Sequence, residues 1–451
     1  MKKPLSLAVL VSGAVLVTSA LAAQPSAAAA AAFEAEAMSL PAPDGMVVAD
    51  ASASGGRALL IWSDGTASEA LTTGAIGTID VRARGDQCAG APTMVLTVDG
   101  ATLGSWSVAS TGWAGYAAAV TLAAGSHTFA ISFTNDFMGY GCDRNLYVDR
   151  VDLAAPTPPA SPLAGISWYV DPNSNAARQA QAWRSTQPAD AAEIEKIAAE
   201  PEADWFGGWS GNIEQAVAAR VAAVDAAGAT PLLVAYDIPL RDCGSYSSGG
   251  ATSPSAYRSW IRGFAAGIGA SPAVVILEPD ALAGLDCLTA GEQSTRLALL
   301  DDAVSVLTAH PGVRVYLDAG NSAWHPAAVM ASRLQAAGVA RAAGFSLNVS
   351  NYFATGDETA YGDAISALTG GAHFVIDTSR DGLGPAPDGA WCNAGGRALG
   401  PRPTALTGAP LVDAYLWVKR PGESDGTCNG GPTAGSWWAE YALGLAQRAR
   451  Y

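Results

Sequence analysis

The feature that most constrains this chain is a repeated pattern in its second half, where short apolar runs stop abruptly at acidic residues. In VVILEPDALAGLDC (274–287), four apolar residues are followed at once by Glu278, Pro279 and Asp280. Three other segments share the pattern: LLVAYDIPLRDC (232–243), VRVYLDAGNSAW (313–324) and YLWVKRPGESDGTC (415–428). Such runs are typical of strands buried on both faces of a parallel sheet.

Segments of helical period separate these runs. The predicted strands are 203–209, 231–237, 273–280, 313–318, 342–348, 372–377 and 412–419. The predicted helices include 191–200, 213–228 and 291–310. Alternation of strands and helices predicts an α/β domain with a parallel sheet. Seven strands favour a barrel, although the pattern alone also permits a three-layer sheet.

Acidic residues follow the predicted strands at their carboxyl ends, where α/β barrels bind ligands. The candidates are Asp242, Asp280, Asp318 and Asp425. A single carboxylate at a strand end is usually a helix cap or a salt-bridge partner. Several on one rim cannot all ionise readily, so at least one should keep its proton near neutral pH, as a general acid requires. Tryptophans near the same strand ends favour sugar stacking and glycosidic cleavage: Trp205, Trp324 and Trp391.

The first part of the chain has a different pattern. Residues 33–153 contain short alternating runs separated by Gly, Asp and Ser, which predicts an all-β sandwich. The segment AAPTPPASPL (154–163) is rich in proline and uncharged, and it is interpreted as an extended linker to a catalytic domain at 164–451.

The beginning of the chain has the pattern of a secretory signal. Lys2 and Lys3 precede an apolar run that ends in small residues, so residues 1–23 are interpreted as a cleaved signal peptide and 24–32 as an alanine-rich spacer. The alternative is a membrane anchor, but the apolar run is short and no second span follows. The sequence therefore predicts a secreted, extracellular protein that does not remain in the membrane.

Composition narrows the choice of partner. The chain has 41 acidic against 25 basic residues, a net charge of −16, and only 15% charged residues. This argues against a nucleic-acid partner and favours a neutral polymer. Six cysteines in an exported chain predict disulfides with fifteen possible connectivities, of which the simplest joins neighbours. Four histidines without a metal-binding spacing predict no zinc site.

The second half resembles glycoside hydrolase family 6 over essentially all of residues 164–451. The motifs that carry the resemblance are YDIPLRDCGSYSSGG (236–250), ILEPDAL (276–282), YLDAGNSAW (316–324), LNVSNY (347–352) and WVKRPGESDG (417–426). The family comprises inverting β-1,4-glucanases, both endoglucanases and cellobiohydrolases, that act on cellulose. The resemblance implies a distorted seven-stranded β/α barrel. We also expect a monomer and catalysis without a cofactor.

Four catalytic assignments follow from the matching motifs. Asp280 resembles the acid that protonates the leaving oxygen. Asp242 resembles the neighbour that raises the pKa of the acid and helps to relay a proton from the attacking water. Ser248 resembles the serine that holds this water, and Asp425 resembles the candidate catalytic base, a role that is debated within the family. Acid and base should stand roughly 6.5–9.5 Å apart, because inversion needs room for a water molecule.

The remaining assignments concern the substrate. Tyr236 resembles the tyrosine that presses on the distorted sugar, and Asp318 resembles a third family aspartate at the site. The sugar platforms would be Trp205, Trp324 and Trp391, and the hydroxyl-binding groups Asn351, Lys419 and Glu423. Asn321 departs from the family pattern, because many members carry His there, and we expect altered binding with intact chemistry.

Three functional classes follow from this resemblance: an endo-β-1,4-glucanase, a cellobiohydrolase with an enclosed tunnel, and an inactive polysaccharide-binding protein. The inactive class is disfavoured because every acid that the family motifs require is present. The endo class is favoured because only GTCNGGPTAGS (426–436) is available to cover the site on that side. The resemblance also implies the bridges Cys243–Cys287 and Cys392–Cys428, which would fix the geometry of the site.

The N-terminal domain resembles a calcium-dependent carbohydrate-binding module of the xylan-binding type, with a jelly-roll-like sandwich. The motifs are FEAEAM (33–38), ASGGRAL (53–59) and FTNDFMGYGCDRNLYVDRVDL (133–153). Asp136 and Asp143 are the candidate calcium or sugar contacts, with turn capping as the alternative, and the bridge Cys88–Cys142 would shape their loop. Three further tryptophans are assigned to packing: Trp62, Trp106 and Trp113. The expected partners are cellulose or another β-glucan or xylan.

Overall fold

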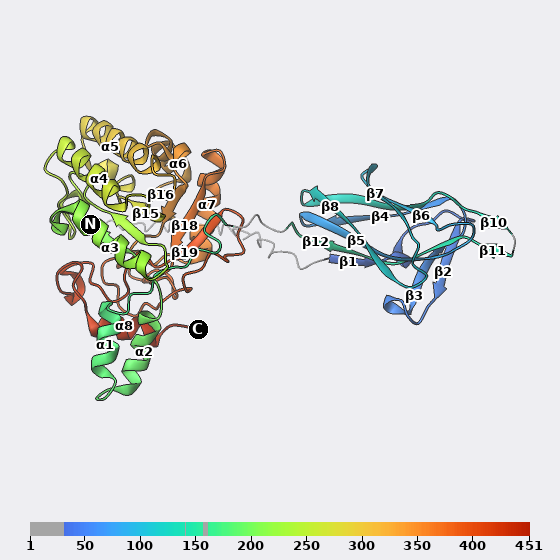
Figure 1. Cartoon of the computed structure of the whole chain (residues 1–451), viewed down its shortest axis with the longest axis horizontal. Helices are drawn as coiled ribbons and strands as arrows, with labels where there is room; N and C mark the ends of the chain where they lie inside the picture. Colours follow the sequence, from blue (N-terminus) through green and yellow to red (C-terminus); the bar gives the residue numbers. More distant parts are fainter. Residues whose placement is uncertain (1–30, 140, 157–160) are drawn as a thin grey trace, which may run out of the picture. The chain divides into compact units, whose positions relative to one another are not determined.

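The structure is a computed structural model that describes residues 31–139, 141–156 and 161–451 (Figure 1). The chain forms two compact units, one on each side of residue 157. The predicted signal peptide lies outside the described residues, as does the predicted spacer except for its last two residues, which begin the first strand. No helix in the described ranges is long and apolar enough to cross a membrane.

The N-terminal unit consists of two antiparallel sheets. One has the order β2-β3-β12-β5-β8, with β1 also paired to β12, and the other has the order β4-β9-β6-β7. The strands are β1 (Ala31–Glu34), β2 (Gly45–Ala49), β3 (Arg57–Ile61), β4 (Gly65–Thr73), β5 (Ile76–Asp86), β6 (Thr93–Val98), β7 (Ala101–Ser107), β8 (Ala114–Leu122), β9 (Gly125–Phe133) and β12 (Asn145–Ala154). A short hairpin joins β10 (Met138–Gly139) to β11 (Cys142–Asp143).

The core of this unit lies between the two sheets. Leu59 and Val81 come from one sheet, Leu96 and Phe129 from the other, and all four belong to one buried cluster. In β6 the burial alternates residue by residue, as expected for a strand with one face toward the core. The unit is therefore the β-sandwich that the alternating runs predict.

The C-terminal unit is built on a parallel sheet whose seven strands follow their order in the chain, from β13 to β19. They are β13 (Asp204–Phe206), β14 (Leu232–Ala235), β15 (Ala273–Leu277), β16 (Val313–Asp318), β17 (Gly344–Leu347), β18 (His373–Asp377) and β19 (Val412–Leu416). Each predicted strand is present. No pairing joins β19 back to β13 in the part of the chain that the structure describes, so the curled sheet stays open along that seam.

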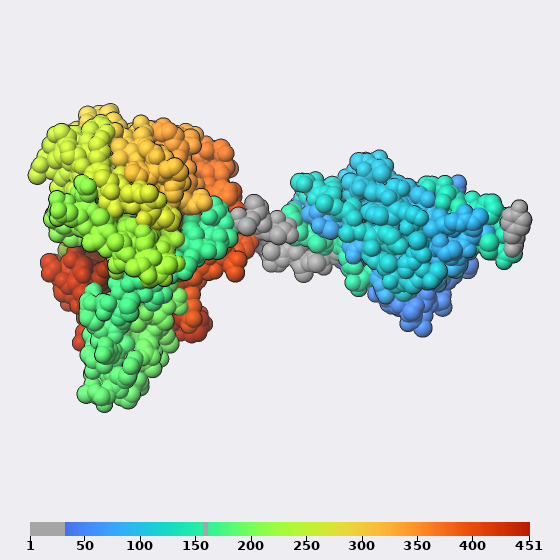
Figure 2. Space-filling model, viewed as in Figure 1, coloured from blue at the N-terminus to red at the C-terminus, as the bar shows by residue number. Residues whose placement is uncertain are grey.

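The helices of this unit are α1 (Asn175–Trp183), α2 (Pro188–Ala198), α3 (Ile213–Ala226), α4 (Pro254–Ile268), α5 (Ala290–Thr308), α6 (Ala327–Ala336), α7 (Thr355–Leu368) and α8 (Ala439–Gln447). Those from α3 to α7 pack against the sheet, whereas α1, α2 and α8 pack with one another in a separate cluster. The sequence encodes their ends: Thr289 and Glu292 form a capping box at the start of α5, and Gly269, at φ 64°, ends α4. The α1–α2 hairpin projects from the body of the unit (Figures 1 and 2).

The strands of this sheet are buried on both faces. In β14, Leu233 belongs to the cluster packed against the helices, while Leu232 and Val234 belong to a second cluster on the inner face. Tyr236 continues the inner series just beyond the strand. This alternation points Tyr236 toward the interior of the curled sheet, where the candidate site lies.

Candidate active site

A cleft of about 1130 Å³ lies at the carboxyl ends of the strands. Every catalytic and substrate-binding residue predicted from the sequence lines this cleft except Asp318. The residues are Tyr236, Asp242, Ser248, Asp280, Asp425, Trp205, Trp324, Trp391, Asn351, Lys419 and Glu423. Residues that are distant in the chain therefore share one surface, as the strand-end argument requires.

In the Glu-Pro-Asp turn after β15, the side chains of Glu278 and Asp280 have different environments. Glu278 and Asp280 both have left-handed backbone, with φ of 51° and 67°. Glu278 is fully buried and accepts hydrogen bonds from the N–H groups of Asp237 (3.0 Å) and Ile238 (3.0 Å). Left-handed conformation costs about 1–2 kcal/mol for a residue with a side chain. These buried hydrogen bonds offset that cost, and they fix the turn after β14 against the turn that carries Asp280.

Asp318 supports Asp280 from behind. Its side chain is 1% exposed, and Oδ1 accepts from the N–H of Asp280 at 2.9 Å and of Gly320 at 3.0 Å. Ser346 donates to Oδ2 at 3.2 Å. Burial raises the pKa of Asp318 to about 7, although these hydrogen bonds act to lower it. Asp318 therefore lies behind Asp280 and does not line the cleft.

The surroundings of the Asp280 carboxyl favour its neutral form. Burial raises its pKa well above the ordinary value for aspartate, and the negative charges of Asp318, Asp242 and Asp425 raise it further. No cation contributes to this shift. The side chain nevertheless keeps part of its surface open to the cleft. A protonated carboxyl at an accessible surface is what general-acid catalysis requires.

Asp242 belongs to a short chain of hydrogen bonds. Its Oδ2 accepts from the backbone N–H of Ser247 at 2.8 Å and from the hydroxyl of Ser247 at 2.9 Å. The same hydroxyl lies 3.0 Å from the hydroxyl of Tyr236. Ser248 lines the cleft, and in the described structure only its backbone bonds to this loop: its carbonyl accepts from Arg241 at 3.4 Å, and its N–H donates to the carbonyl of Ser245 at 3.1 Å. The serine that holds Asp242 is thus Ser247, which the sequence did not single out.

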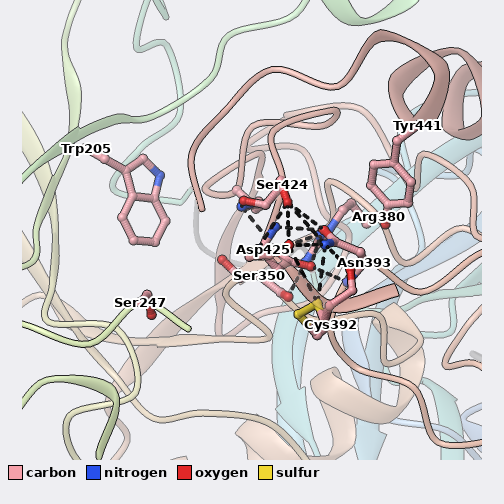
Figure 3. Close-up of polar contacts among 12 residues, drawn as sticks. Trp205, Ser247, Ser350, Arg380, Cys392, Asn393, Ser424, Asp425 and Tyr441 are labelled. Carbon is pink, nitrogen blue, oxygen red and sulfur yellow. Dashed lines mark hydrogen bonds and ion pairs between the residues drawn. A yellow bond between two sulfur atoms is a disulfide. The ribbon is translucent and has the colours of Figure 1, made fainter. Parts of the chain in front are cut away.

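The charged neighbours of Asp425 are cations, whereas those of Asp280 are acidic residues. Arg380 donates to both of its oxygens, at 3.0 and 2.8 Å, and Lys419 Nζ lies 3.1 Å from Oδ1. The N–H of Asn393 donates to Oδ2 at 2.8 Å. Although burial acts to raise it, Arg380 and Lys419 lower the pKa of Asp425 to about 2. Figure 3 shows Asp425 within this dense set of contacts, with Ser247 lying apart from it.

Exposed aromatic rings line the cleft. Trp391 is 53% exposed and Trp324 42%, whereas Trp205 is half-buried, with its ring edge-on to Tyr236. The cleft also exposes Trp209 (59%) and Tyr246 (49%), which the sequence analysis did not select. Both follow strands in glycine-rich segments, which is the signal that could have identified them.

Some of the predicted hydroxyl-binding residues already make hydrogen bonds or ion pairs within the protein. Lys419 bonds to Asp425 and to the carbonyl of Ser424. Glu423 accepts from Asn175 Nδ2 at 3.1 Å and lies 3.5 Å from Arg420. Asn351 and Asn321 line the cleft, the latter 5% exposed, with its Oδ1 accepting from Ala323 N–H at 3.1 Å.

The disulfides join the neighbouring cysteines, as the simplest pairing predicts. Cys88 is bonded to Cys142, Cys243 to Cys287, and Cys392 to Cys428. The second bridge ties the segment after Asp242 to the segment after Asp280. The third ties the segment after Trp391 to the segment after Asp425, so both fix loops of the cleft.

In the N-terminal unit, the two candidate calcium residues lie close to each other. Burial raises the pKa of Asp136, and the charge of Asp143 raises it further, followed by that of Asp64. One oxygen of Asp143, Oδ1, is buried and has no hydrogen-bond partner among the residues that the structure describes. The described residues hold no group of three or more His, Cys, Asp or Glu side chains arranged for a metal. Calcium would therefore fit here only with backbone carbonyls or water completing its six to eight oxygen ligands.

Comparison with known proteins agrees with this geometry. The family model "Glycosyl hydrolases family 6" matches residues 163–449. The model "Ca-dependent carbohydrate-binding module xylan-binding" matches residues 78–163. The chain is 49% identical to endoglucanase A of Cellulomonas fimi over 287 residues, which is 63% of this chain and 62% of that protein. It is 46% identical to endoglucanase 1 of Streptomyces halstedii, over 61% of this chain and 87% of that one.

A solved structure also matches. The endoglucanase Cel6 of Mycobacterium tuberculosis, in complex with methyl-cellobiosyl-4-deoxy-4-thio-β-D-cellobioside, is 50% identical with a TM-score of 0.61, covering 64% of this chain and 99% of that one. A protein of Aspergillus fumigatus named "Probable 1,4-beta-D-glucan cellobiohydrolase C" is more distant, at 33% identity over 49% of this chain and 63% of that one. The family model spans more than half of the chain, and the chain therefore belongs to glycosyl hydrolase family 6. This chain covers less than two thirds of the length of the Cellulomonas protein.

Proposed function

We propose that this protein is a secreted, inverting endo-β-1,4-glucanase that hydrolyses cellulose and related β-1,4-glucans. The observation that carries the proposal is the contrast between two carboxyl groups on one cleft. Burial and neighbouring charges keep Asp280 protonated, while Arg380 and Lys419 keep Asp425 ionised. Two carboxyl groups whose surroundings separate their pKa values, beside aromatic platforms, suit the cleavage of a glycosidic bond.

In the proposed reaction, Asp280 gives its proton to the glycosidic oxygen as the bond to the anomeric carbon breaks. Water attacks the opposite face of that carbon, and the proton it loses passes toward Asp242, with Ser248 holding the water. The hydroxyl of Tyr236 stays protonated, because burial and then Asp280 and Asp242 raise its pKa. Tyr236 therefore meets the distorted sugar as a neutral hydrogen-bonding group.

We assign the proton-accepting role to Asp242 and an electrostatic role to Asp425. A carboxylate whose pKa is about 2, and which is saturated by two cations, is a weak base at neutral pH. Asp242 has no cation among its hydrogen-bond partners, which are the N–H and hydroxyl of Ser247. Asp425 instead neutralises one of the two positive charges of Arg380 and Lys419, which would otherwise disfavour the positive charge developing on the sugar ring.

The endo assignment rests on the segment 426–436. Its backbone folds back on Ser424: Gly435 donates to the Ser424 carbonyl at 2.9 Å, and the Ser424 hydroxyl donates to the carbonyl of Pro432 at 2.8 Å. Cys428 is fixed by its disulfide to Cys392. A segment held at these points does not extend over the cleft as a roof. The names of the more similar relatives, both endoglucanases, support the same conclusion.

An open cleft should cut cellulose chains internally. The viscosity of carboxymethylcellulose should therefore fall sharply while few reducing ends have formed, and both quantities can be followed in one digest. A slow fall in viscosity with cellobiose dominating from the first time points would instead support the cellobiohydrolase alternative.

A single displacement by water should invert the anomeric configuration. Proton NMR of a fresh digest of a cello-oligosaccharide should show the α-anomer of the new reducing end before mutarotation. An initial β-anomer would contradict the inverting mechanism, whatever the viscosity experiment shows.

We propose that the N-terminal unit binds xylan or a β-glucan, with Asp136 and Asp143 among the calcium contacts. The unit has its own core, so residues 33–153 can be tested alone. They should bind insoluble xylan or cellulose, and EDTA should weaken binding until calcium is restored. Binding that EDTA leaves unchanged would exclude calcium, and an Asp136→Asn and Asp143→Asn double variant that binds normally would exclude these ligands.

The proposed secretion rests on the amino-terminal sequence and on the three disulfides, since disulfides persist in oxidising compartments.

A further inference from the structure

The loop that carries Asp242 (residues 241–250, the Asp242 loop) is held at its base. Arg241 N–H donates to the carbonyl of Gly249 at 3.2 Å, and Cys243 is bonded to Cys287. Asp242 and Cys243 both have left-handed backbone, with φ of 54° and 48°. Strained backbone of this kind persists only where surrounding contacts determine it.

The far part of this loop contacts the segments around Trp391 and Asp425, which also line the cleft. The ring of Tyr246 lies 6.1 Å from the ring of Trp391, with the planes tilted by 55°. Tyr246 also packs directly on Gly426, where a side chain would place its Cβ 2.6 Å from the Cβ of Tyr246. Gly426 follows Asp425, so Tyr246 touches the residue next to the second charged carboxylate of the site.

Both of these contacts come from segments that the third disulfide fixes. Trp391 precedes Cys392, and Gly426 lies two residues before Cys428, its partner. Tyr246 therefore contacts segments that a disulfide holds in place. The residues of its own loop, from Cys243 to Gly249, are mainly exposed. The Tyr246 hydroxyl makes no hydrogen bond in the described structure, so the ring itself carries the contact.

The residue after Tyr246 is the one that holds Asp242. The Ser247 N–H and hydroxyl both donate to Asp242 Oδ2, at 2.8 and 2.9 Å, and the hydroxyl also meets the hydroxyl of Tyr236. Because Tyr246 and Ser247 are adjacent, the position of the Tyr246 ring sets the direction of the Ser247 N–H. A displacement of about 1 Å at a reacting group can cost about 100-fold in rate.

We propose that Tyr246 and Ser247 form a positioning unit for Asp242: Tyr246 docks the Asp242 loop on Gly426 and Trp391, and Ser247 thereby places the Asp242 carboxylate. Neither residue takes part in proton transfer, and both act through Asp242. This inference rests on the proposed function, since it needs Asp242 to serve the hydrolytic step.

The test compares Tyr246→Ala, Tyr246→Phe and the wild-type chain on cellopentaose. Tyr246→Ala should lower kcat about 10- to 100-fold, with a smaller change in KM and an unchanged melting temperature. Tyr246→Phe keeps the ring and should retain kcat within about twofold. Leu240→Ala is the matched control, because Leu240 lies just before the same loop, is 51% exposed and does not line the cleft.

A double-mutant cycle separates positioning through Asp242 from a direct role. In an Asp242→Ala background, Tyr246→Ala should cause no further loss, because the group it positions is absent. Ser247→Ala should likewise be non-additive with Tyr246→Ala. A full additional loss in the Asp242→Ala background, or wild-type kcat in Tyr246→Ala, would overturn the inference. Absence of hydrolysis by the wild-type chain would instead overturn the proposed function.

Discussion

Asp280→Asn should reduce turnover of cellulose and unactivated cello-oligosaccharides by about 10²- to 10⁴-fold, the contribution of a positioned general acid. The leaving oxygen of a glucan is a poor leaving group without a proton, and the amide introduced by this substitution is too weak an acid to supply one. Aryl cellobiosides with acidic phenols need less protonation and should lose much less. Binding of a cello-oligosaccharide, measured by calorimetry, should change little, because asparagine has nearly the shape of aspartate.

A second variant, Asp318→Asn, tests whether the charge of Asp318 raises the pKa of Asp280. The introduced amide keeps an oxygen that can accept from the N–H groups of Asp280 and Gly320, so the turn should survive. The substitution removes a negative charge that raises the pKa of Asp280. The pKa of Asp280 should therefore fall, the acid should lose its proton at lower pH, and the alkaline limb of the kcat/KM profile should move to lower pH. Wild-type turnover in Asp280→Asn, or an alkaline limb that moves upward in Asp318→Asn, would contradict these roles.

Much of this site could be predicted from the sequence, because parallel strands buried on both faces have a distinct pattern. Apolar runs that end in acidic residues placed Asp242, Asp280 and Asp425 at one rim, and the structure brings these three to one cleft. The same pattern also identifies acidic residues whose side chains are buried and do not line the cleft. Asp318 ends a strand, yet it is buried behind Asp280.

Residue type and strand position do not tell which way a carboxylate points. Glu278 lies two residues from Asp280, but it is buried and holds the N–H groups of the turn after β14. Asp377 ends β18 and is buried in the same way, accepting from the N–H groups of Lys419 (2.9 Å) and Ser350 (3.0 Å). The direction depends on left-handed backbone at individual residues and on partners in neighbouring strands, neither of which has a local signature.

Contacts that are distant in the chain were beyond the reach of the sequence pattern. Arg380 is an isolated arginine after β18, and nothing in its spacing marks it as the partner of Asp425, 45 residues later. Tyr246 and Gly426 are also in contact, although they are far apart in the chain. Ser247 and Ser248 are adjacent and chemically identical, and only the backbone turn decides which of them meets Asp242.

Asp425→Ala should lose folding stability as well as turnover, which distinguishes it from Asp242→Ala. The side chain of Arg380 is fully buried and that of Asp425 is 8% exposed. Removing one partner of a buried ion pair leaves an uncompensated charge and costs about 3–5 kcal/mol. The melting temperature should fall by roughly 6–20 °C. Asp242 is only half-buried and has no cation partner among its hydrogen bonds, so Asp242→Ala should melt within a few degrees of the wild type while its turnover is lost.

The pH dependence of this stability difference gives an independent check on the ion pair. The pKa of Asp425 is about 2 in the folded chain, below the value of about 3.9 for an unfolded aspartate. A depressed folded pKa stabilises the folded state fully above the unfolded pKa, and this contribution disappears as pH falls toward the folded pKa. The difference in melting temperature between the wild type and Asp425→Ala should therefore be constant near neutral pH and shrink between about pH 4 and pH 2. Equal melting temperatures at neutral pH would show that Arg380 and Lys419 do not hold Asp425 as an ion pair, and the proton-accepting role could then return to Asp425.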